Sequence, residues 1–424
     1  MPRSTFNAVR QNFPWRTDPI FGLIRLLQMQ RFLLNSLSIL AFCAVSLTLS
    51  AQNCIDDGER VINPDGSDCT NTVVSAVPFL RINPDARGGA MGDAGVALSG
   101  DANAIHYNAS RLAFAQEDLA LGATYTPWLQ ALGLNDVYLA YLGGFKKLDE
   151  FQAIGASLRY FSLGDIQFTD VNGTFLAVGK PNEFEVSLAY SRKLSDRFSA
   201  SLTGKYINSN LAAGQEVNGV VLEAANSFAA DLGFTYRNEE TNSGDAIAFG
   251  AAIQNIGAKV SYTRDTIRDF LPANLSLGTA YTFRFDAYNE LTLTAETNKL
   301  LVPSPCDGTD PDCDQDERND QAPVTALFSS FGDAPQGFSE ELREFTWSVG
   351  AEYWYDQQFA VRAGYFSEHQ TKGGRKYLTA GLGVKYNIFG LNFSYLIPTS
   401  NQRNPLDNTL RFSLLFDFGA QANQ

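Results

Sequence analysis

Residues 343–369, REFTWSVGAEYWYDQQFAVRAGYFSEH, contain two alternating segments joined by the two-residue turn Gln357-Gln358. Six apolar or aromatic side chains share one face of the first segment: Phe345, Trp347, Val349, Ala351, Tyr353 and Tyr355. Apolar residues at every second position are typical of a strand with one apolar face. The stretch therefore predicts an antiparallel β-hairpin.

The same alternation recurs across residues 118–419. We count fourteen segments, at 118–129, 136–148, 151–170, 184–194, 198–211, 226–239, 245–262, 271–285, 289–302, 343–356, 359–369, 376–387, 388–399 and 410–419. An even number of antiparallel strands can close into a transmembrane barrel, and lipid offers no partner to an unpaired strand edge. The fold class predicted is therefore all-β, a fourteen-stranded outer-membrane barrel.

The connections between these segments alternate in length. Short ones, such as Asp149-Glu150 and Gln357-Gln358, alternate with longer ones, of which residues 303–342 are the longest. Short periplasmic turns and long outer loops are typical of outer-membrane barrels. A large soluble all-β domain is the alternative, but it gives no reason for this parity. The prediction places the chain in the outer membrane of a Gram-negative bacterium, with its long loops at the cell surface.

Composition excludes other classes. The 424 residues include 46 acidic and 32 basic side chains, a net charge of −14, whereas a nucleic-acid binder needs a basic face. A hydrophobic fraction of 45% is too high for a disordered chain. Two histidines leave little room for a His-rich metal site. Few charges (18%) and many aromatics (12%) fit a lipid-facing β-protein.

The first 51 residues are predicted to be a signal peptide. Residues 32–49 form the only long apolar run, basic residues precede it, and Ser50-Ala51-Gln52 resembles a cleavage site. Met29 offers an alternative start, and an uncleaved signal anchor is the alternative interpretation. Removing residues 1–51 leaves 27 basic against 45 acidic residues, a net charge of −18.

Four cysteines remain in the exported chain. An even number of cysteines in such a chain suggests disulfides. The local pairs Cys54–Cys69 and Cys306–Cys313 are simplest, although three connectivities are possible. Four free thiols are the alternative.

A glycine-rich stretch of small residues precedes the first strand, AVPFLRINPDARGGAMGDAGVALSGDANAIHYNASRLAF, residues 76–114. It cannot form a membrane strand. We predict that residues 76–117 form a plug inside the barrel, after a Cys-bearing lead at 52–75. Buried charges need partners, and Arg87 is expected to pair with Glu185 or Glu296. A solvated periplasmic linker is the alternative.

Motifs within this stretch resemble known families. It is similar to the N-terminal segment of the FadL transporter superfamily, with Asn108-Ala109-Ser110 where that superfamily has an Asn-Pro-Ala-like turn. A closer resemblance is to the PorV family of type IX secretion outer-membrane proteins. That resemblance rests on Met91-Gly92-Asp93-Ala94-Gly95, on residues 158–170, and on a first motif made of Phe79, Leu80, Arg81, Ile82, Asn83, Pro84, Asp85, Ala86 and Arg87. The lead and the loop 303–342 depart from the family pattern.

The PorV resemblance implies a shuttle. Such proteins take cargo by its C-terminal domain from the giant type IX translocon barrel and deliver it to a surface sortase complex that attaches it to lipopolysaccharide. The FadL resemblance implies instead a transporter of hydrophobic solutes, in which a kink of the third strand opens a lateral portal. Gly164 is the candidate for such a bend, and an ordinary flexible glycine is the alternative.

The long loop is strongly acidic. Residues 303–342 hold ten acids and one base, a net −9. Four aspartates at alternate positions could present oxygen ligands to Ca²⁺: Asp310, Asp312, Asp314 and Asp316. A solvated anionic loop and a protein-contacting loop are the alternatives. No other cofactor is expected.

No enzymatic site is predicted. His106 lies in the plug, and His369 lies with Ser367 at the end of the eleventh segment. A lipid A acyl hydrolase using His369 and Ser367 is a second alternative, although both residues fit a polar barrel rim. The short tail 420–424 follows the last strand.

Overall fold

The computed structural model describes residues 55–56, 61–62 and 71–419, apart from 130–133, 135, 170–174, 213, 218–219, 240–243, 264–267, 307–312, 336 and 400–408. The chain divides into two units, Met1–Ser67 and Asp68–Gln424. In the first, strands β1 (Ile55–Asp56) and β2 (Val61–Ile62) pair antiparallel. The predicted signal peptide, Cys54, Cys69 and the tail 420–424 lie outside the described residues.

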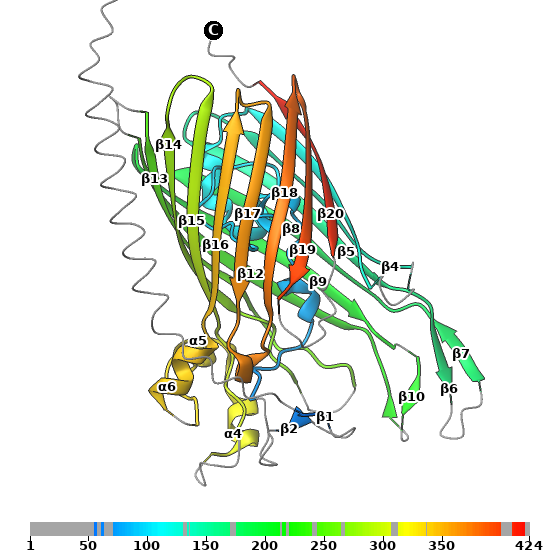
Figure 1. The fold of residues 1–424 in the computed structure, drawn as a ribbon. Helices are drawn as coiled ribbons and strands as arrows, with labels where there is room; N and C mark the ends of the chain where they lie inside the picture. The colour runs from blue at the N-terminus through cyan, green and yellow to red at the C-terminus, as the bar shows by residue number, and fades with distance from the viewer. Residues whose placement is uncertain are drawn as a thin grey trace, which may run out of the picture. The chain divides into compact units, whose positions relative to one another are not determined.

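The second unit contains a closed antiparallel barrel of fourteen strands, as predicted (Figure 1). Its strands are β3 (Leu119–Pro127), β4 (Val137–Lys147), β5 (Gln152–Leu163), β8 (Asn182–Lys193), β9 (Phe198–Asn210), β12 (Ala225–Glu239), β13 (Ala246–Gly257), β14 (Asn274–Arg284), β15 (Asn289–Leu300), β16 (Thr346–Tyr355), β17 (Phe359–Ser367), β18 (Lys376–Tyr386), β19 (Phe389–Pro398) and β20 (Leu410–Phe418). Pairing of β20 with β3, from Phe412↔Tyr125 to Phe418↔Leu119, closes the ring.

Alternation along each strand separates a polar lumen from an apolar outer wall. In β16, Ser348 and Glu352 are buried inside the barrel, whereas Trp347 and Val349 are exposed on its outside. Lipid solvates the exposed apolar face, and the barrel leaves no strand edge unpaired. The hairpin predicted for residues 343–369 consists of β16 and β17.

The two ends of the barrel differ. Short turns join β4 to β5, β8 to β9, β14 to β15, β16 to β17 and β18 to β19 at one end, which is uppermost in Figure 1. The opposite end carries the long connections. The longest contains α4 (Gln315–Asp320), α5 (Pro323–Ser329), α6 (Phe338–Glu341) and the 3-10 turn η4 (Leu342–Glu344), none of which the alternation predicted. A further 3-10 turn, η5 (Gln370–Lys372), lies between β17 and β18. The long loops lie at the cell surface.

The third predicted segment, 151–170, belongs to the barrel wall only as far as Leu163, the end of β5. After β5 the chain bends at Gly164 (φ +77°) and continues as β6 (Ile166–Thr169), which pairs with β7 (Phe175–Gly179) in a separate hairpin. A left-handed φ is strained for any residue with a Cβ, so glycine suits this bend. A second hairpin at the same end joins β10 (Glu216–Val217) to β11 (Val220–Val221).

The bend at Gly164 does not separate β5 from the two strands that pair with it, β4 and β8. The end of β5 still pairs with both neighbours, through Val137↔Leu163 and Ser162↔Asn182. The bend therefore lies at the outer rim, beyond the last paired residues. The lateral portal that the FadL resemblance implied is not formed at this position.

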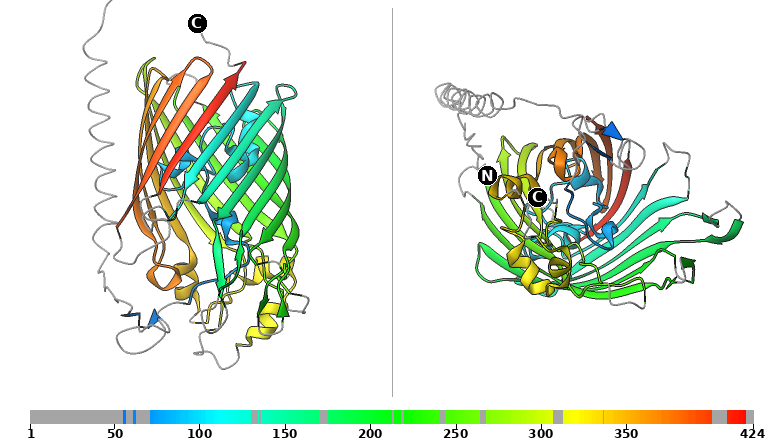
Figure 2. Two further views of the ribbon diagram at one scale, coloured as in Figure 1. Left: turned by 90° about the vertical axis from the view of Figure 1, so that its right-hand side faces the viewer. Right: turned by 90° about the horizontal axis from the view of Figure 1, so that it is seen from below.

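Residues 71–117, named here the inner segment, lie inside the ring of strands (Figure 2). They contain the 3-10 turns η1 (Pro78–Arg81) and η2 (Ala109–Phe114) and the short helices α2 (Ala86–Gly89) and α3 (Ala104–Tyr107). Among the described residues, no helix is long and apolar enough to span a membrane.

Candidate functional site

The inner segment passes through the lumen from the end with long loops to the end with short turns. At its start, the Asn71 N–H donates to the carbonyl of Thr371, in the loop between β17 and β18, at 2.9 Å. After its end, the Asp118 N–H donates to the carbonyl of Phe418, the last residue of β20, at 3.2 Å. The segment therefore contacts both ends of the barrel, and its first residues lie on the cell-surface side.

The apolar half of the first motif holds the segment against the wall. Phe79 and Leu80 are buried in a cluster with lumen-facing residues of β4, β5 and β9, among them Leu139, Phe161 and Ile207. The Phe79 ring stacks on Phe161 with centroids 6.5 Å apart. Burying two large apolar side chains contributes roughly 1.5–3 kcal/mol each. This contact fixes where the segment enters the lumen.

The polar half of the motif builds the first helix of the segment. Asp85 is the N-cap of α2, and its carboxylate accepts from the N–H groups of Arg87 at 3.1 Å and Gly88 at 2.8 Å. Asn83 in turn accepts from the Asp85 N–H at 2.9 Å and from the Tyr107 hydroxyl at 2.6 Å. A side-chain cap of this kind stabilises a helix start by about 1 kcal/mol. Buried Pro84 lies between the two polar residues.

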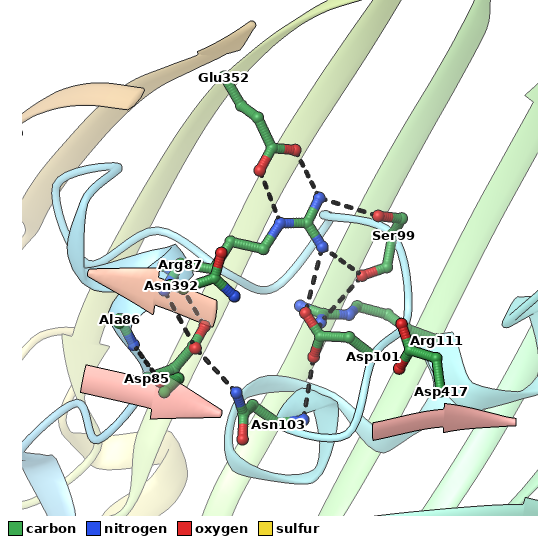
Figure 3. Close-up of polar contacts among 12 residues, drawn as sticks. Asp85, Ala86, Arg87, Ser99, Asp101, Asn103, Arg111, Glu352, Asn392 and Asp417 are labelled. Carbon is green, nitrogen blue, oxygen red and sulfur yellow. Dashed lines mark hydrogen bonds and ion pairs between the residues drawn. The ribbon is translucent and has the colours of Figure 1, made fainter. Parts of the chain in front are cut away.

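Arg87 carries the strongest link between α2 and the wall (Figure 3). Its guanidinium grips Glu352 of β16 bidentately, with Nε–Oε2 at 2.8 Å and Nη2–Oε1 at 2.6 Å. Nη1 also pairs with Asp101 of the inner segment at 3.1 Å. Glu352 receives a second arginine, Arg362 of β17, at 2.6 Å. Bidentate, charge-assisted bonds of this geometry are among the strongest hydrogen bonds in proteins.

The expected partners of Arg87 were wrong in identity. Glu185 instead faces Arg159, at 3.6 Å. Glu296 accepts from a backbone N–H of the inner segment, that of Gly95, at 2.7 Å. The reason is the direction of α2, which turns Arg87 toward β16. The direction of α2 depends on tertiary structure. The prediction that Arg87 pairs with a carboxylate in the lumen needed only the charge of Arg87.

Gly92 and Asp93, in the Met91-Gly92-Asp93-Ala94-Gly95 motif, make a tight bend against the wall. Gly92 (φ +72°) and Asp93 (φ +64°) both adopt left-handed backbone. A Cβ on Gly92 would lie 2.6 Å from the Tyr365 carbonyl oxygen. The Gly92 N–H donates to the Thr379 hydroxyl at 2.9 Å. The Asp93 carboxylate accepts from the Tyr377 hydroxyl at 2.5 Å. Both residues thus join the inner segment to β17 and β18.

Asn108 ties the end of the segment to β12. Its Nδ2 donates to the carbonyls of Val96 at 3.1 Å and Phe234 at 3.0 Å. Its Oδ1 accepts from the Ser110 hydroxyl at 2.6 Å. The Asn-Ala-Ser turn therefore uses the asparagine amide to satisfy buried backbone groups on two elements.

Two cavities formed by described residues of the lumen share no lining residue. The cavity toward the long loops has a volume of about 580 Å³, and the one toward the short turns about 400 Å³. The first is lined by Phe79, Asn83, Asp93 and Tyr107 of the inner segment, whereas the second is lined by Arg87, Ser99, Asp101 and Arg111. The inner segment therefore lies between them.

The long loop is anchored by two buried lysines that the sequence analysis did not single out. Lys299 of β15 pairs with Glu341 at 2.5 Å and Glu344 at 2.6 Å. Lys372 of η5 pairs with Glu340 at 2.5 Å and Glu344 at 3.0 Å. Burial raises the pKa of Glu341, although Lys299 acts in the opposite direction. Glu340 and Glu341 of the loop, together with Glu344 just after it, thus attach the loop to the barrel.

The acidic core of the loop is described only in part. A disulfide joins Cys306 to Cys313, with Cα atoms 5.8 Å apart. Asp314 caps α4, and its carboxylate accepts from the N–H groups of Asp316 at 2.9 Å and Glu317 at 3.2 Å. The other two candidate ligands, Asp310 and Asp312, lie outside the described residues. Within the described ranges, no three His, Cys, Asp or Glu residues are grouped to hold a metal ion.

The two histidines have structural partners. His106 Nδ1 lies 2.5 Å from Nη2 of Arg159. His369 Nδ1 lies 2.9 Å from the Thr371 hydroxyl, and the side chain caps η5 by accepting from the Thr371 N–H.

The polar partners on the strands were missed by the sequence analysis. Glu352, Arg362, Tyr377 and Arg411, which pairs with Asp93 at 3.3 Å, have little local signature. A lumen-facing residue looks like any polar residue on an alternating strand. Glu352 and Arg362 are register partners on β16 and β17, so opposite charges at facing positions were the available signal.

These features define a class: a fourteen-stranded outer-membrane barrel whose own N-terminal segment occupies the lumen. The profile of the family described as "Type IX secretion system protein PorV" matches residues 66–307, more than half of the chain. The chain belongs to this family. It is therefore a type IX secretion component of the outer membrane, and membership points to secretion or transport.

Other comparisons are more remote. A comparison with curated proteins finds no match. Similar solved structures include the Ralstonia pickettii toluene transporter TbuX, at 13% identity over 80% of this chain and 98% of that chain with a TM-score of 0.46. A Pseudomonas aeruginosa FadL homologue has 11% identity over 79% and 98%, with a TM-score of 0.41. Likenesses this weak bear on neither substrate nor mechanism.

Proposed function

We propose that this protein is the shuttle of a type IX secretion system. It receives cargo C-terminal domains from the giant translocon barrel and delivers them to the surface sortase complex. The family match over residues 66–307 carries this proposal, because it includes the motif that builds the inner segment. The cargo, the translocon and the sortase complex are the partners proposed, together with lipopolysaccharide in the surrounding membrane.

The architecture supports a role at the surface of the barrel. The lumen holds the inner segment, and we propose that this segment seals it. Protein partners would then bind outside the lumen. The hairpins β6–β7 and β10–β11 extend the cell-surface end and expose apolar side chains suited to such contacts: Ile166, Phe175, Val178, Val220 and Val221.

Deletion of the gene tests the proposal. We expect cargo to accumulate in the periplasm with its C-terminal domain uncleaved, and surface-attached cargo to fall at least tenfold on immunoblots of cell fractions. Complementation with the wild-type chain is the control. Normal secretion together with lost uptake of a hydrophobic nutrient would instead support a transporter.

A transporter of hydrophobic solutes is the second candidate. The cavity of about 580 Å³ favours it, since Phe79, Leu80, Trp128 and Phe161 line part of this space. Serine, threonine and charged residues on most of the lumen wall weigh against it, because a path for apolar solutes needs apolar walls. The deletion experiment separates the two functions.

The inner segment also predicts where the N-terminal lead emerges. Asn71 is bonded to loops at the cell-surface end, so we expect an epitope inserted between Thr70 and Asn71 to be detected by antibody on intact cells. The same epitope placed in the short turn between Asp149 and Glu150 is the matched control, detected only after the outer membrane is permeabilised. Detection of the Asp149–Glu150 epitope on intact cells, with the Thr70–Asn71 epitope detected only after permeabilisation, would reverse the orientation.

We propose the remaining features on sequence grounds. Residues 1–51 act as a signal peptide, 52–75 form the Cys-bearing lead, and a Cys54–Cys69 bond closes that lead. Calcium binding by the acidic loop stays a proposal, with Asp310 and Asp312 as its central ligands. Isothermal titration with CaCl₂ before and after replacing both by asparagine would test it.

A further inference from the structure

Helix α5 exposes large apolar side chains on the face where a solvated loop helix would carry polar ones. Val324, Phe328 and Phe331 are 62%, 76% and 45% exposed. Their spacing of four and then three residues places them on one face of the helical turn. The opposite face holds fully buried Ala326 and Ser330. Val324 and Phe328 thus point away from the protein, whereas the Phe331 ring, just after the helix, lies 5.8 Å from Nζ of buried Lys299.

The protein-facing side of α5 packs at the outer rim of the barrel wall. Ala326 belongs to a buried cluster with Phe270 and Leu301, and Ile253 and Leu275 pack against the same cluster. Figure 1 shows α5 and α6 beyond the strand ends that carry the long loops.

Ile253 and Leu275 face the membrane. They are register partners on β13 and β14. Their neighbours Ala252 and Ser276 are buried, and Ala252 packs against Val96 of the inner segment. Because alternate residues of a strand point to opposite faces, Ile253 and Leu275 point outward. The surface of α5 is therefore continuous with the lipid-facing wall.

Charge divides this loop into two parts. Residues 321–332 contain no charged side chain, whereas the preceding helix α4 exposes Asp316, Glu317 and Asp320. Further along the loop Phe338 and Leu342 are exposed as well, and the lipid-facing Trp347 follows at the start of β16. Exposed apolar side chains beside a lipid-facing wall favour placement in the bilayer interface, because binding there scales with the apolar area buried.

We propose that α5 lies on the outer leaflet and inserts Val324 and Phe328 among its acyl chains, with Phe331 between the membrane and Lys299. The long loop then has two attachments, the buried lysine–glutamate cluster and the membrane itself. The acidic α4 is held above the lipid surface by this arrangement. A docking site for another protein is the competing outcome, because exposed apolar patches also mark such sites.

Spin-label accessibility tests the proposal. The full chain carrying Cys43→Ser, Cys54→Ser and Cys69→Ser is labelled at Phe328→Cys and reconstituted in phosphatidylcholine–phosphatidylglycerol nanodiscs, with Glu317→Cys on α4 as the matched control. We expect collisions with the water-soluble nickel relaxant at position 328 to be several-fold fewer than at 317, and collisions with oxygen several-fold more frequent.

Two outcomes would overturn the inference. Equal nickel accessibility at both positions in the nanodisc would place α5 in water. Protection of position 328 only after another protein is added would make the stripe a docking surface. Heat-modifiable migration of each labelled chain on gels verifies that the barrel has folded, and Val324→Cys provides a second position if Phe328→Cys does not fold.

Discussion

Replacing Gly364 by valine should displace the inner segment and open a path through the barrel. A Cβ at Gly364 would lie 2.1 Å from the Gly92 nitrogen and 2.3 Å from the Met91 carbonyl carbon. These are backbone atoms of a tight bend, so they cannot move aside as a flexible side chain could. Overpacking of this kind costs about 1–3 kcal/mol or more. The wall itself should survive, because its backbone pairing does not involve side chains.

Conductance across planar lipid bilayers measures this effect. We expect the Gly364→Val barrel to conduct, because displacement of residues 91–92 joins the two cavities, while the wild-type barrel stays closed. Gly204→Val is the matched control, since no atom lies within 4 Å of a Cβ at that mid-strand glycine. Gly364→Val barrels that stay closed although trypsin now cuts their inner segment would contradict the proposed seal, and resistance to trypsin would contradict the predicted displacement. If valine prevents folding, Gly364→Ala provides a milder version of the same clash.

Replacing Arg87 by methionine should lower the free energy of unfolding by about 3 kcal/mol. Glu352 is buried and loses its bidentate partner in this variant, and Asp101 loses a bond of 3.1 Å. Breaking a buried pair from one side is costly because it leaves a charge without its partner. Arg362 stays beside Glu352, which keeps the expected loss at the lower end of the usual range.

Urea unfolding of the protein in lipid vesicles measures this loss. Arg192→Met is the matched control, because Arg192 is exposed on β8, and it should change stability by less than about 0.5 kcal/mol. Equal midpoints for the two variants would show that the Arg87–Glu352 contact does not hold the inner segment. The Arg87 variant should also conduct intermittently in bilayers, because α2 loses its main attachment to β16.

The sequence predicted the barrel closely because strand periodicity is a local property. Each lumen-facing residue follows a lipid-facing one, so the pattern of residues 343–369 contains both the strands and their hairpin. The number of strands, their order and the end that carries the long loops followed from the same alternation. The segment 151–170 was extended too far, because alternation continues past Gly164 into a strand that pairs elsewhere.

Some properties of the inner segment were also predictable from the sequence. Its glycines and small residues excluded a membrane strand, and its charged residues implied partners in the lumen. The sequence did not indicate which lumen residues those partners are. Arg87 reaches a residue 265 positions away on β16, and nothing local distinguishes Glu352 from Glu185 or Glu296.

Sequence alone therefore determined the repeating wall, the presence of a non-strand N-terminal segment and the acidity of the long loop. Tertiary structure decided which carboxylate binds Arg87, where Gly92 meets β17, how two lysines anchor the loop and which side of α5 remains exposed. The physical reason is range. Alternation and charge content are set by neighbouring residues, whereas buried pairs and close backbone contacts depend on how distant strands are brought together when the barrel closes.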